Sequence, residues 1–377
     1  MKTIGYVSLS DPYHDRAAWS GTTYKLRESI EKAGFKVIWI PYTPSSKLVW
    51  WLSHIIRIFN KKSIQYGVYP LYLKSCAKSI NLDLVANCDI LFFPGMASIM
   101  RYLKVEKSFI YYSDATVHDM LDYYWFDVDR ITRYFAERQE KWAIQHCTMK
   151  MSASSWAANT VREYYGCDAS KNHVLLLGAN IDDCDLQNVE KKSFAGKLKI
   201  LFSGVEWERK GAAIAIDAVL ELNKRGIDAE LIMCGLKEIP SDSIPLPSCV
   251  KNLGFLNKNK AEEYEKYAYA ITDADIFLLP TKAECAGIVF CETSANGIPA
   301  FTYDTGGIPD YVVNGKNGYR LPLGSTGKDF ADKIQDCINN NELTALSKQA
   351  RDYYHEALNW SAWSKKFKKI MDAYFNE

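Results

Sequence analysis

Short apolar runs alternate with longer amphipathic segments along almost the whole chain. In the first half, six apolar runs predict strands: residues 3–8, 36–40, 87–93, 109–112, 149–153 and 174–177. Three amphipathic segments predict helices between them: residues 22–33, residues 130–145 and a segment that begins near Ser154 or Ser155. Strands that alternate with helices in this way predict a parallel sheet with helices on both faces.

The same alternation starts again after a polar stretch at residues 182–197, which we interpret as a linker. The second half has predicted strands at residues 199–202, 229–234, 275–279 and 300–303, and predicted helices at residues 211–225, 260–267 and 288–296. A last helix is predicted at residues 360–375, where large apolar side chains recur at helical spacing. The chain is therefore predicted to be an α/β protein with two Rossmann-like domains.

Composition supports two domains and excludes some functions. A chain of 377 residues is too long for one ordinary core, and 48% hydrophobic with 24% charged residues is typical of a globular protein. The 46 basic and 45 acidic residues nearly cancel, so the overall charge does not favour nucleic-acid binding. The 10 cysteines form no C-x-x-C pair, and we expect reduced thiols in a cytoplasmic protein. The N-terminus has no signal-peptide pattern, and no apolar run is long enough to span a membrane.

The most informative stretch is residues 280–310, which begins where an apolar strand ends. Glu284 lies in the predicted loop, Gly287 follows it, and Glu292 lies on the next helix. The carboxyl ends of parallel strands are where open α/β sheets bind ligands. A helix N-terminus at this place offers unpaired N–H donors and the positive end of a dipole to a phosphate group.

The spacing of Glu284 and Glu292, followed by Gly-Ile-Pro and Gly-Gly-Ile-Pro-Asp, resembles the family-4 glycosyltransferases. These are retaining, metal-independent enzymes that transfer a sugar from a nucleotide-sugar donor. The resemblance implies the GT-B fold, in which two Rossmann-like domains face each other across a cleft and the last helix crosses back onto the first domain. It implies an acceptor-side domain at residues 1–185, a nucleotide-sugar-binding domain at residues 186–355 and the returning helix at residues 356–377.

Transfer of a sugar expels a nucleoside diphosphate, and without a metal the protein must supply cations and N–H donors to it. The segment at residues 202–211 resembles the phosphate-binding stretch of the family, which usually ends in Lys-Gly. Lys210 matches that lysine. Val205 stands where the family usually has an arginine, so Arg209 either takes the missing role by bidentate binding of phosphate or is a solvated surface residue.

The resemblance places Glu292 at the ribose hydroxyls of the donor and Glu284 near the donor sugar. Glu284 could instead be an exposed loop acid, and Glu292 a helix residue with a salt-bridge partner. Further contacts to the donor are implied for Gly204, Gly235, Leu256, Gly287, Ile288 and Val289, mainly through the backbone. The family usually has Phe-Gly where this chain has Ala286-Gly287, which we expect to alter the sugar pocket.

Two places in the first half are candidates for the acceptor side. Gly21 belongs to a segment that resembles the glycine-rich loop of the family, although Ser20 or Thr22 there could serve only as a helix N-cap. After the strand at residues 109–112, Asp114 and His118 are the two candidates for contact with the acceptor hydroxyl, with a structural histidine as the alternative reading of His118.

Two Asp-x-Asp pairs look like the metal motif of the other main glycosyltransferase fold. One is Asp273 with Asp275, and the other is Asp127 with Asp129. A magnesium site needs carboxylates that converge on the substrate phosphate, whereas Asp273 and Asp275 precede their strand and lie away from the expected site. We therefore expect no metal and no cofactor beyond the UDP- or GDP-linked donor.

Residues 32–82 contain no acidic residue and eight basic ones. Within them, residues 48–59, from Leu48 to Phe59, are densely apolar and include Trp50 and Trp51. Tryptophan flanked by basic residues is typical of a helix in an anionic membrane surface. The alternative is that these side chains pack into the core of the first domain. We expect a cytoplasmic protein that binds the inner face of the membrane peripherally through this segment.

The sequence thus favours a retaining glycosyltransferase with a glycan or lipid-linked glycan as acceptor, in surface polysaccharide or glycoconjugate synthesis. A sugar-nucleotide epimerase or a phosphorylase on the same fold is a competing enzyme. A non-catalytic GT-B partner subunit that binds glycan or membrane is the alternative from another class. Hydrolysis of the donor by the purified protein would distinguish an enzyme from a non-catalytic partner subunit.

Overall fold

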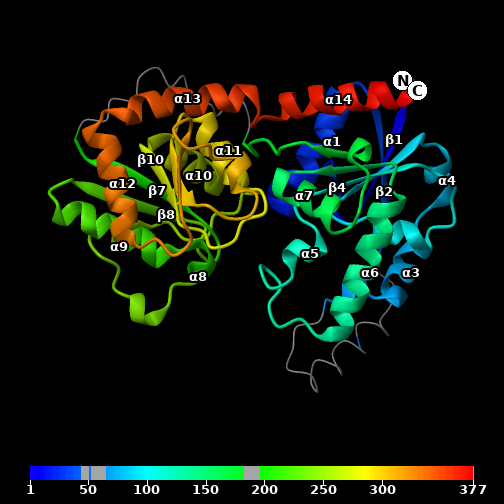
Figure 1. Ribbon diagram of the computed structural model, residues 1–377, viewed down its shortest axis with the longest axis horizontal. Helices are drawn as coiled ribbons and strands as arrows, with labels where there is room; N and C mark the ends of the chain where they lie inside the picture. Colours follow the sequence, from blue (N-terminus) through cyan, green and yellow to red (C-terminus); the bar gives the residue numbers. More distant parts are fainter. Residues whose placement is uncertain (44–50, 52–64, 182–195, 377) are drawn as a thin grey trace. The chain divides into compact units, whose positions relative to one another are not determined.

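The computed structural model describes residues 1–43, 51, 65–181 and 196–376. The described chain divides into two compact units. Unit 1 comprises Met1–Leu176 together with Ser364–Glu377, and unit 2 comprises Leu177–Trp363. Each unit is built around its own parallel sheet (Figure 1).

Unit 1 contains a six-stranded sheet in the order β2-β1-β3-β4-β5-β6. Its strands are β1 (Thr3–Ser8), β2 (Lys36–Pro41), β3 (Ile90–Pro94), β4 (Phe109–Ser113), β5 (Met149–Ser152) and β6 (Asn172–Val174). All neighbouring strands are parallel. The central strands are nearly continuous apolar runs because helices cover both of their faces.

Helices of unit 1 lie on both sides of this sheet (Figure 1). They are α1 (Thr22–Lys32), α3 (Pro70–Ser79), α4 (Leu82–Ala86), α5 (Val117–Met120), α6 (Arg130–His146), α7 (Ser155–Glu163) and the C-terminal part of α14 (Trp360–Asn376). The ring of Phe367 on α14 lies 5.7 Å from Phe35 and 6.2 Å from Phe92 between ring centroids. The last helix therefore returns to the first unit, as the resemblance implied.

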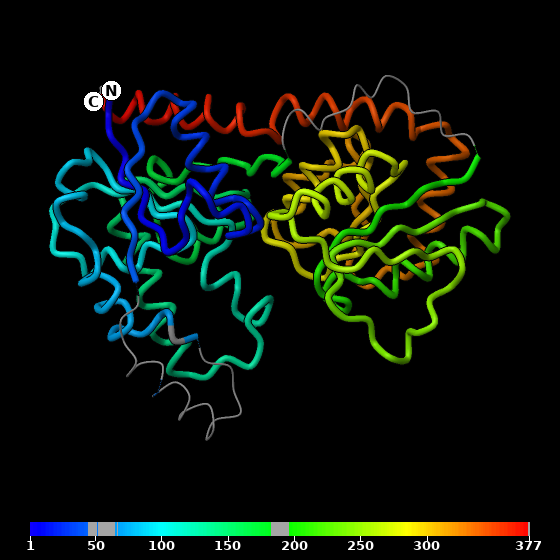
Figure 2. The backbone as a smooth tube through the Cα atoms, turned by 180° about the vertical axis from the view of Figure 1, so that it is seen from behind, coloured from blue at the N-terminus to red at the C-terminus, as the bar shows by residue number. Residues whose placement is uncertain are grey.

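The two chain ends lie next to each other in both views of the backbone (Figures 1 and 2). The ammonium of Lys2 lies 4.9 Å from the ring centroid of Phe375. Because α14 also buries Phe367 and Met371 completely, the end of the chain is part of the core of unit 1.

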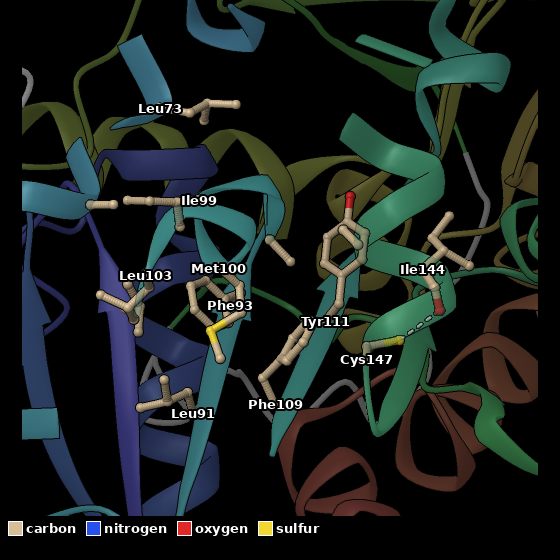
Figure 3. Close-up of a cluster of buried hydrophobic side chains, with 14 of the residues drawn as sticks. Leu73, Leu91, Phe93, Ile99, Met100, Leu103, Phe109, Tyr111, Ile144 and Cys147 are labelled. Carbon is tan, nitrogen blue, oxygen red and sulfur yellow. Dashed lines mark hydrogen bonds between the residues drawn. The ribbon is translucent and has the colours of Figure 1, made fainter. Parts of the chain in front are cut away.

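A large apolar cluster fills the space between the sheet of unit 1 and helices α3 and α6 (Figure 3). Leu91 and Phe93 contribute to it from β3, and Phe109 and Tyr111 contribute from β4. Side chains from the helices complete the cluster, among them Leu73, Ile144 and Cys147. Tyr111 differs from the others in carrying a buried hydroxyl, which donates to Glu140 on α6 at 2.9 Å.

Unit 2 contains a second six-stranded parallel sheet, in the order β12-β11-β10-β7-β8-β9. Its strands are β7 (Leu198–Ser203), β8 (Ala229–Cys234), β9 (Val250–Asn252), β10 (Ile276–Leu279), β11 (Ala300–Tyr303) and β12 (Gly318–Leu321). The chain moves from β7 to β8 and β9 on one side and returns to β10 on the other. The loops after β7 and β10 therefore start side by side at the switch point of this sheet, where the order of strands reverses.

The helices of unit 2 are α8 (Trp207–Lys210), α9 (Ala212–Lys224), α10 (Ala261–Asp273), α11 (Ile288–Ala295), α12 (Gly327–Asn339), α13 (Glu342–Glu356) and the first residues of α14. Gly211 separates α8 from α9, with a φ of 73°. A Cβ at this position would lie 2.2 Å from the carbonyl oxygen of Pro280, directly after β10. Only glycine therefore allows the α8–α9 junction to approach the loop that carries Glu284.

The predicted α/β fold with parallel sheets is confirmed, and several boundaries are corrected. The strand predicted at residues 87–93 begins only at Ile90, because a short helix, α4, precedes it and residues 87–89 connect the two. Asn81 is the N-cap of α4 and accepts a hydrogen bond from the Asp83 N–H at 2.9 Å. The strand predicted at residues 174–177 is displaced to Asn172–Val174. The helix predicted at residues 211–225 is confirmed as α9, which begins after Gly211, and the one predicted at residues 260–267 continues to Asp273.

Candidate functional site

The loops at the switch point of unit 2 bring a lysine and a glutamate together. Lys210 ends α8, in the connection that follows β7, and Glu284 lies in the loop after β10. Their side chains form an ion pair and are each 12% exposed. The backbone carbonyl of Glu284 accepts a hydrogen bond from the Gly307 N–H at 3.0 Å, which fixes the loop. The structure thus places an acid and a cation at the edge of the sheet where α/β proteins bind ligands.

Arg209 lies at the same loop through a different set of contacts. Its guanidinium donates to the carbonyl of Ala283 at 3.1 Å and to both carboxylate oxygens of Glu206, at 3.1 and 2.9 Å. The bidentate bond from Arg209 lowers the pKa of Glu206. Arg209 and Lys210 are therefore both held beside the acidic loop, and Arg209 is not a freely solvated surface residue.

Two glycines, Gly204 and Gly235, allow the backbone to pack closely beside Lys210. A Cβ on Gly204 would lie 2.7 Å from Cγ of Lys210, so the aliphatic part of the lysine lies directly over this glycine. Gly235 has a φ of 93°, and a Cβ there would lie 3.0 Å from the carbonyl oxygen of Gly204. The Gly204 N–H also donates to the Cys234 carbonyl at 3.0 Å. Both predicted glycines thus permit close packing of the loops after β7 and β8.

The loop after β9 continues this edge of the sheet. The Gly235 N–H donates to the carbonyl of Gly254 at 2.8 Å, which joins the loops after β8 and β9. Leu256 is half-buried in the latter loop, and its neighbour Phe255 is 49% exposed. The ammonium of Lys237 lies 5.5 Å from the centroid of the Phe255 ring. The aromatic ring of Phe255 and the ammonium of Lys237 therefore lie together at this edge of the sheet.

Glu292 lies on α11 with partners that the sequence did not predict. It is only 1% exposed, and the ammonium of Lys258 donates to its Oε1 at 2.7 Å. The hydroxyl of Tyr267 donates to its Oε2. Burial, followed by the nearby charge of Glu292, raises the pKa of Tyr267 well above its usual value, so the phenol remains a donor. The pair with Lys258 fits the alternative in which Glu292 is a helix residue with a salt-bridge partner.

The N-terminus of α11 lies next to Glu284. Gly287 is the N-cap, has a φ of 74° and makes no side-chain capping bond. A Cβ on Gly287 would lie 2.5 Å from Cδ2 of Phe290 and 3.3 Å from Cγ of Glu284. The close approach of Glu284 to the helix N-terminus therefore depends on glycine. Ile288 and Val289, the first residues of α11, are half-buried.

In unit 1, the loop after β1 has an unusual backbone. Trp19 and Ser20 have φ values of 51° and 56°, and Gly21 follows with a φ of 92° as the N-cap of α1. Left-handed conformations cost roughly 1–2 kcal/mol for each non-glycine residue. The indole N–H of Trp19 donates to Oδ2 of Asp114, after β4, at 3.2 Å. The alternative in which Ser20 or Thr22 caps the helix is wrong.

His118 lies apart from the contact between Asp114 and Trp19. Its ring stacks on Tyr164 at 3.7 Å between centroids, and its Nδ1 lies 3.6 Å from the carboxylate of Glu137. Thr116 and Asp119 form a capping box that starts α5, the helix that carries His118. The described contacts of His118 are thus with Tyr164 and Glu137, whereas Asp114 contacts the strained loop.

Three aspartates of the two Asp-x-Asp pairs have structural partners, namely Asp273, Asp275 and Asp129. Asp273 accepts from the Lys199 ammonium at 2.6 Å, and Asp275 accepts from the Lys199 backbone N–H at 2.8 Å, at the amino end of β7. Asp129 caps α6. Within the described ranges, no group of three or more His, Cys, Asp or Glu residues is placed to hold a metal ion.

The predicted membrane segment at residues 48–59 lies almost entirely outside the described residues. Of the helices that the structure describes, none combines the length and the apolar character that crossing a bilayer requires.

Two parallel-sheet units of this topology, with the last helix packed on the first unit, define a GT-B fold of the kind found in glycosyltransferases. Solved structures share it along the full chain. A sucrose-phosphate synthase from Thermosynechococcus elongatus has a TM-score of 0.66 at 16% identity, with 100% of both chains covered. Anabaena Alr3699/HepE in complex with UDP-glucose has a TM-score of 0.63 at 15% identity, with 99% of this chain and 100% of that chain covered. A UDP-N-acetylglucosamine 2-epimerase described as putative, from Listeria monocytogenes, has a TM-score of 0.62 at 13% identity and covers 100% and 97%.

Sequence comparison gives a family match for the second half of the chain. Residues 185–353 match the family model described as glycosyl transferases group 1. The amylovoran biosynthesis glycosyltransferase AmsK of Erwinia amylovora is 29% identical over 172 residues, which are 42% of this chain and 40% of that protein. The putative colanic acid biosynthesis glycosyltransferase WcaL of Salmonella typhimurium is 23% identical over 385 residues, 94% and 89% of the two chains. The chain thus spans less than half of AmsK but most of WcaL.

The pair of Lys258 and Glu292 makes a testable contribution to stability. Lys258→Met leaves a buried carboxylate without its cation, and we expect it to lower the free energy of unfolding by about 1–3 kcal/mol. Adding Glu292→Gln recovers most of the loss because both charges are then absent. Urea unfolding followed by circular dichroism measures these changes.

The matched control is Lys251→Met. Lys251 pairs with Glu230 at 3.0 Å, but its side chain is 63% exposed, so we expect a change of about 0–1 kcal/mol. A Lys258→Met variant that loses no more stability than this control would contradict the assignment of a compensating charge.

Proposed function

We propose that this protein is a retaining, metal-independent glycosyltransferase that moves a sugar from a nucleotide-sugar donor to a glycan or a lipid-linked glycan. The observation that carries the proposal is the pairing of Lys210 with Glu284 at the switch point of unit 2, next to the N-terminus of α11. Residues 185–353, which match glycosyl transferases group 1, contain all of these residues.

The chemistry follows from the needs of the leaving group. Charge builds on the diphosphate as the bond to the sugar breaks, and fixed positive charge and N–H donors lower the free energy of that transition state. Lys210 supplies an ammonium, and the N–H groups of Ile288 and Val289 supply donors at the positive end of the helix dipole. Glu284 neutralises Lys210 in this structure, and an incoming diphosphate would take over the ammonium and leave the carboxylate for the donor sugar.

Glu292 and the loops after β8 and β9 are the proposed site for the nucleoside. Each oxygen of Glu292 accepts one hydrogen bond, from Lys258 or from Tyr267, and a carboxylate oxygen has a second lone pair for a ribose hydroxyl. Leu256 and the backbone at Gly235 line the same edge and would contact the base. A UDP-linked donor is supported by the fold shared with HepE, which was solved with UDP-glucose, and a GDP-linked donor remains the other candidate.

The acceptor side is proposed to be the loops at the carboxyl edge of unit 1. Asp114 is the candidate to guide the proton of the acceptor hydroxyl, because it faces the strained Trp19–Gly21 loop, whereas His118 packs on Tyr164. Strained backbone that persists in a native fold is concentrated at functional sites. Relatives named for amylovoran and colanic acid synthesis support a polysaccharide acceptor.

Two other functions compete with this proposal. An epimerase on the same fold is a real alternative, since the fold is shared with the putative UDP-N-acetylglucosamine 2-epimerase from Listeria monocytogenes. A non-catalytic partner subunit would also keep the fold. The group 1 match over residues 185–353 favours transfer over epimerisation, and the retained Lys210, Glu284 and Glu292 favour catalysis over a binding role.

The first test is the rate of transfer and of slow donor hydrolysis, measured with a panel of UDP- and GDP-sugars. Lys210→Ala is expected to lower kcat about 10²- to 10³-fold, because it removes a charge that stabilises the leaving group. The same rate with and without EDTA is expected for the parent protein. Thermal unfolding checks that the variant is folded.

Lys224→Ala is the matched control. Lys224 lies on α9 with a side chain that is 79% exposed, and it pairs with Glu221 at 3.6 Å, so its removal should leave the rate unchanged. Near-normal kinetics for Lys210→Ala would contradict the proposed role. Conversion of the donor to an epimer, without transfer or hydrolysis, would establish the epimerase instead.

Peripheral binding of the membrane is a separate part of the proposal, and it rests on the sequence of residues 32–82. We expect the protein to co-sediment with vesicles that contain anionic lipid and to lose binding in the double variant Lys61→Glu/Lys62→Glu, because basic residues near the surface each contribute roughly 1 kcal/mol. The control is the same charge reversal at Lys365 and Lys366 on α14. Binding that survives the change at Lys61 and Lys62 would remove this part.

A further inference from the structure

Unit 1 contains a fully buried lysine that the proposed chemistry does not use. Lys150 lies on β5 and has no exposed surface. Its ammonium donates to the Ser113 Oγ at 2.8 Å, to the Met151 carbonyl at 3.0 Å and to the Ser152 Oγ at 3.3 Å. All three donors of the ammonium are therefore used inside the protein.

A buried carboxylate compensates this charge. The ammonium of Lys150 lies 4.4 Å from the centroid of the Tyr111 ring, and the Tyr111 hydroxyl donates to Oε1 of Glu140 at 2.9 Å. Burial raises the pKa of Glu140 to about 7 and lowers the pKa of Lys150 to about 8, while the charge of each partner opposes the shift of the other. Such a pair adds little stability over apolar side chains of similar volume, so its retention calls for another reason.

Ser113 links the Lys150 ammonium to the proposed acceptor-side loop. Ser113 is the last residue of β4, and its hydroxyl donates to the Ala115 carbonyl at 2.8 Å while it accepts from Lys150. The turn between Ser113 and Ala115 contains Asp114, whose carboxylate accepts from the indole of Trp19. Hydrogen bonds at Ser113 and at Asp114, joined by the backbone of the turn between them, thus connect Lys150 to the strained loop after β1.

We propose that Lys150 is a positioning residue for the acceptor side. Its ammonium fixes the Ser113 hydroxyl, the serine fixes the turn that carries Asp114, and Asp114 holds Trp19 in its left-handed conformation. The inference rests on the proposed function, in which Asp114 guides the acceptor hydroxyl. Lys150 itself touches no substrate, and it acts only through the placement of Asp114 and the Trp19–Gly21 loop.

The test separates positioning from the stability of the buried pair. Lys150→Met alone leaves Glu140 buried without its cation, and we expect a lower unfolding midpoint. The double variant Lys150→Met/Glu140→Gln removes both charges and should restore most of that loss. Ser113→Ala is the third variant, because it breaks the link to the turn and leaves both charges in place.

The structural readout is ¹⁹F NMR of protein labelled with 5-fluorotryptophan, in which Trp19→Phe assigns the resonance of Trp19. We expect the Trp19 resonance to shift or broaden in the double variant and in Ser113→Ala. The kinetic readout is transfer: kcat should fall roughly 10- to 100-fold, as expected for a misplaced reacting group. The Kd of the nucleoside diphosphate, a ligand of unit 2, should change less than about twofold, a difference of about 0.4 kcal/mol.

An unchanged Trp19 resonance in a folded double variant or in Ser113→Ala would overturn the inference, as would a normal kcat for transfer in a parent-active protein. If the double variant does not fold, Ser113→Ala decides. If the parent neither binds a nucleotide sugar nor transfers sugar, the proposed function fails. The NMR readout would then still show whether Lys150 positions the loop.

Discussion

The ion pair between Lys210 and Glu284 is the interaction on which the account of this protein depends. It exists because the order of strands reverses between β7 and β10, which leaves the two following loops side by side at the edge of the sheet. Gly211 allows the helix junction to approach Pro280, and Gly287 allows the acidic loop to approach α11. The topology and two glycines thus bring together residues that are 74 positions apart in the sequence.

Cations at this edge of unit 2 are paired with acidic side chains of the same unit. Lys210 is paired with Glu284, Arg209 with Glu206, and Lys258 with Glu292. In the proposed reaction, a diphosphate would replace Glu284 as the anionic partner of Lys210, so that the ammonium is never left without a counter-charge. Unit 1 uses a buried pair differently, because Lys150 and Glu140 are enclosed and their hydrogen bonds lead to a loop rather than to a ligand.

Much of the fold could be predicted because parallel strands buried on both faces are apolar runs, and such runs are visible at β1, β7 and β10. The short strands β9 and β12 lack that signal and were missed. Lys210 and Glu284 could be predicted from their places after strands. Lys258 could not, because it lies in a polar loop without periodicity, and its partner is 34 residues away. Lys150 carried a usable signal, since a lysine inside a buried strand requires a counter-charge.

The most direct test of the central claim is a crystal structure of the protein with a nucleoside diphosphate. The account predicts that the β-phosphate lies within hydrogen-bonding distance of the Lys210 ammonium and of the N–H groups that begin α11, with Glu284 released from the lysine. A structure in which the diphosphate binds elsewhere, while Lys210 keeps its pair with Glu284, would contradict it.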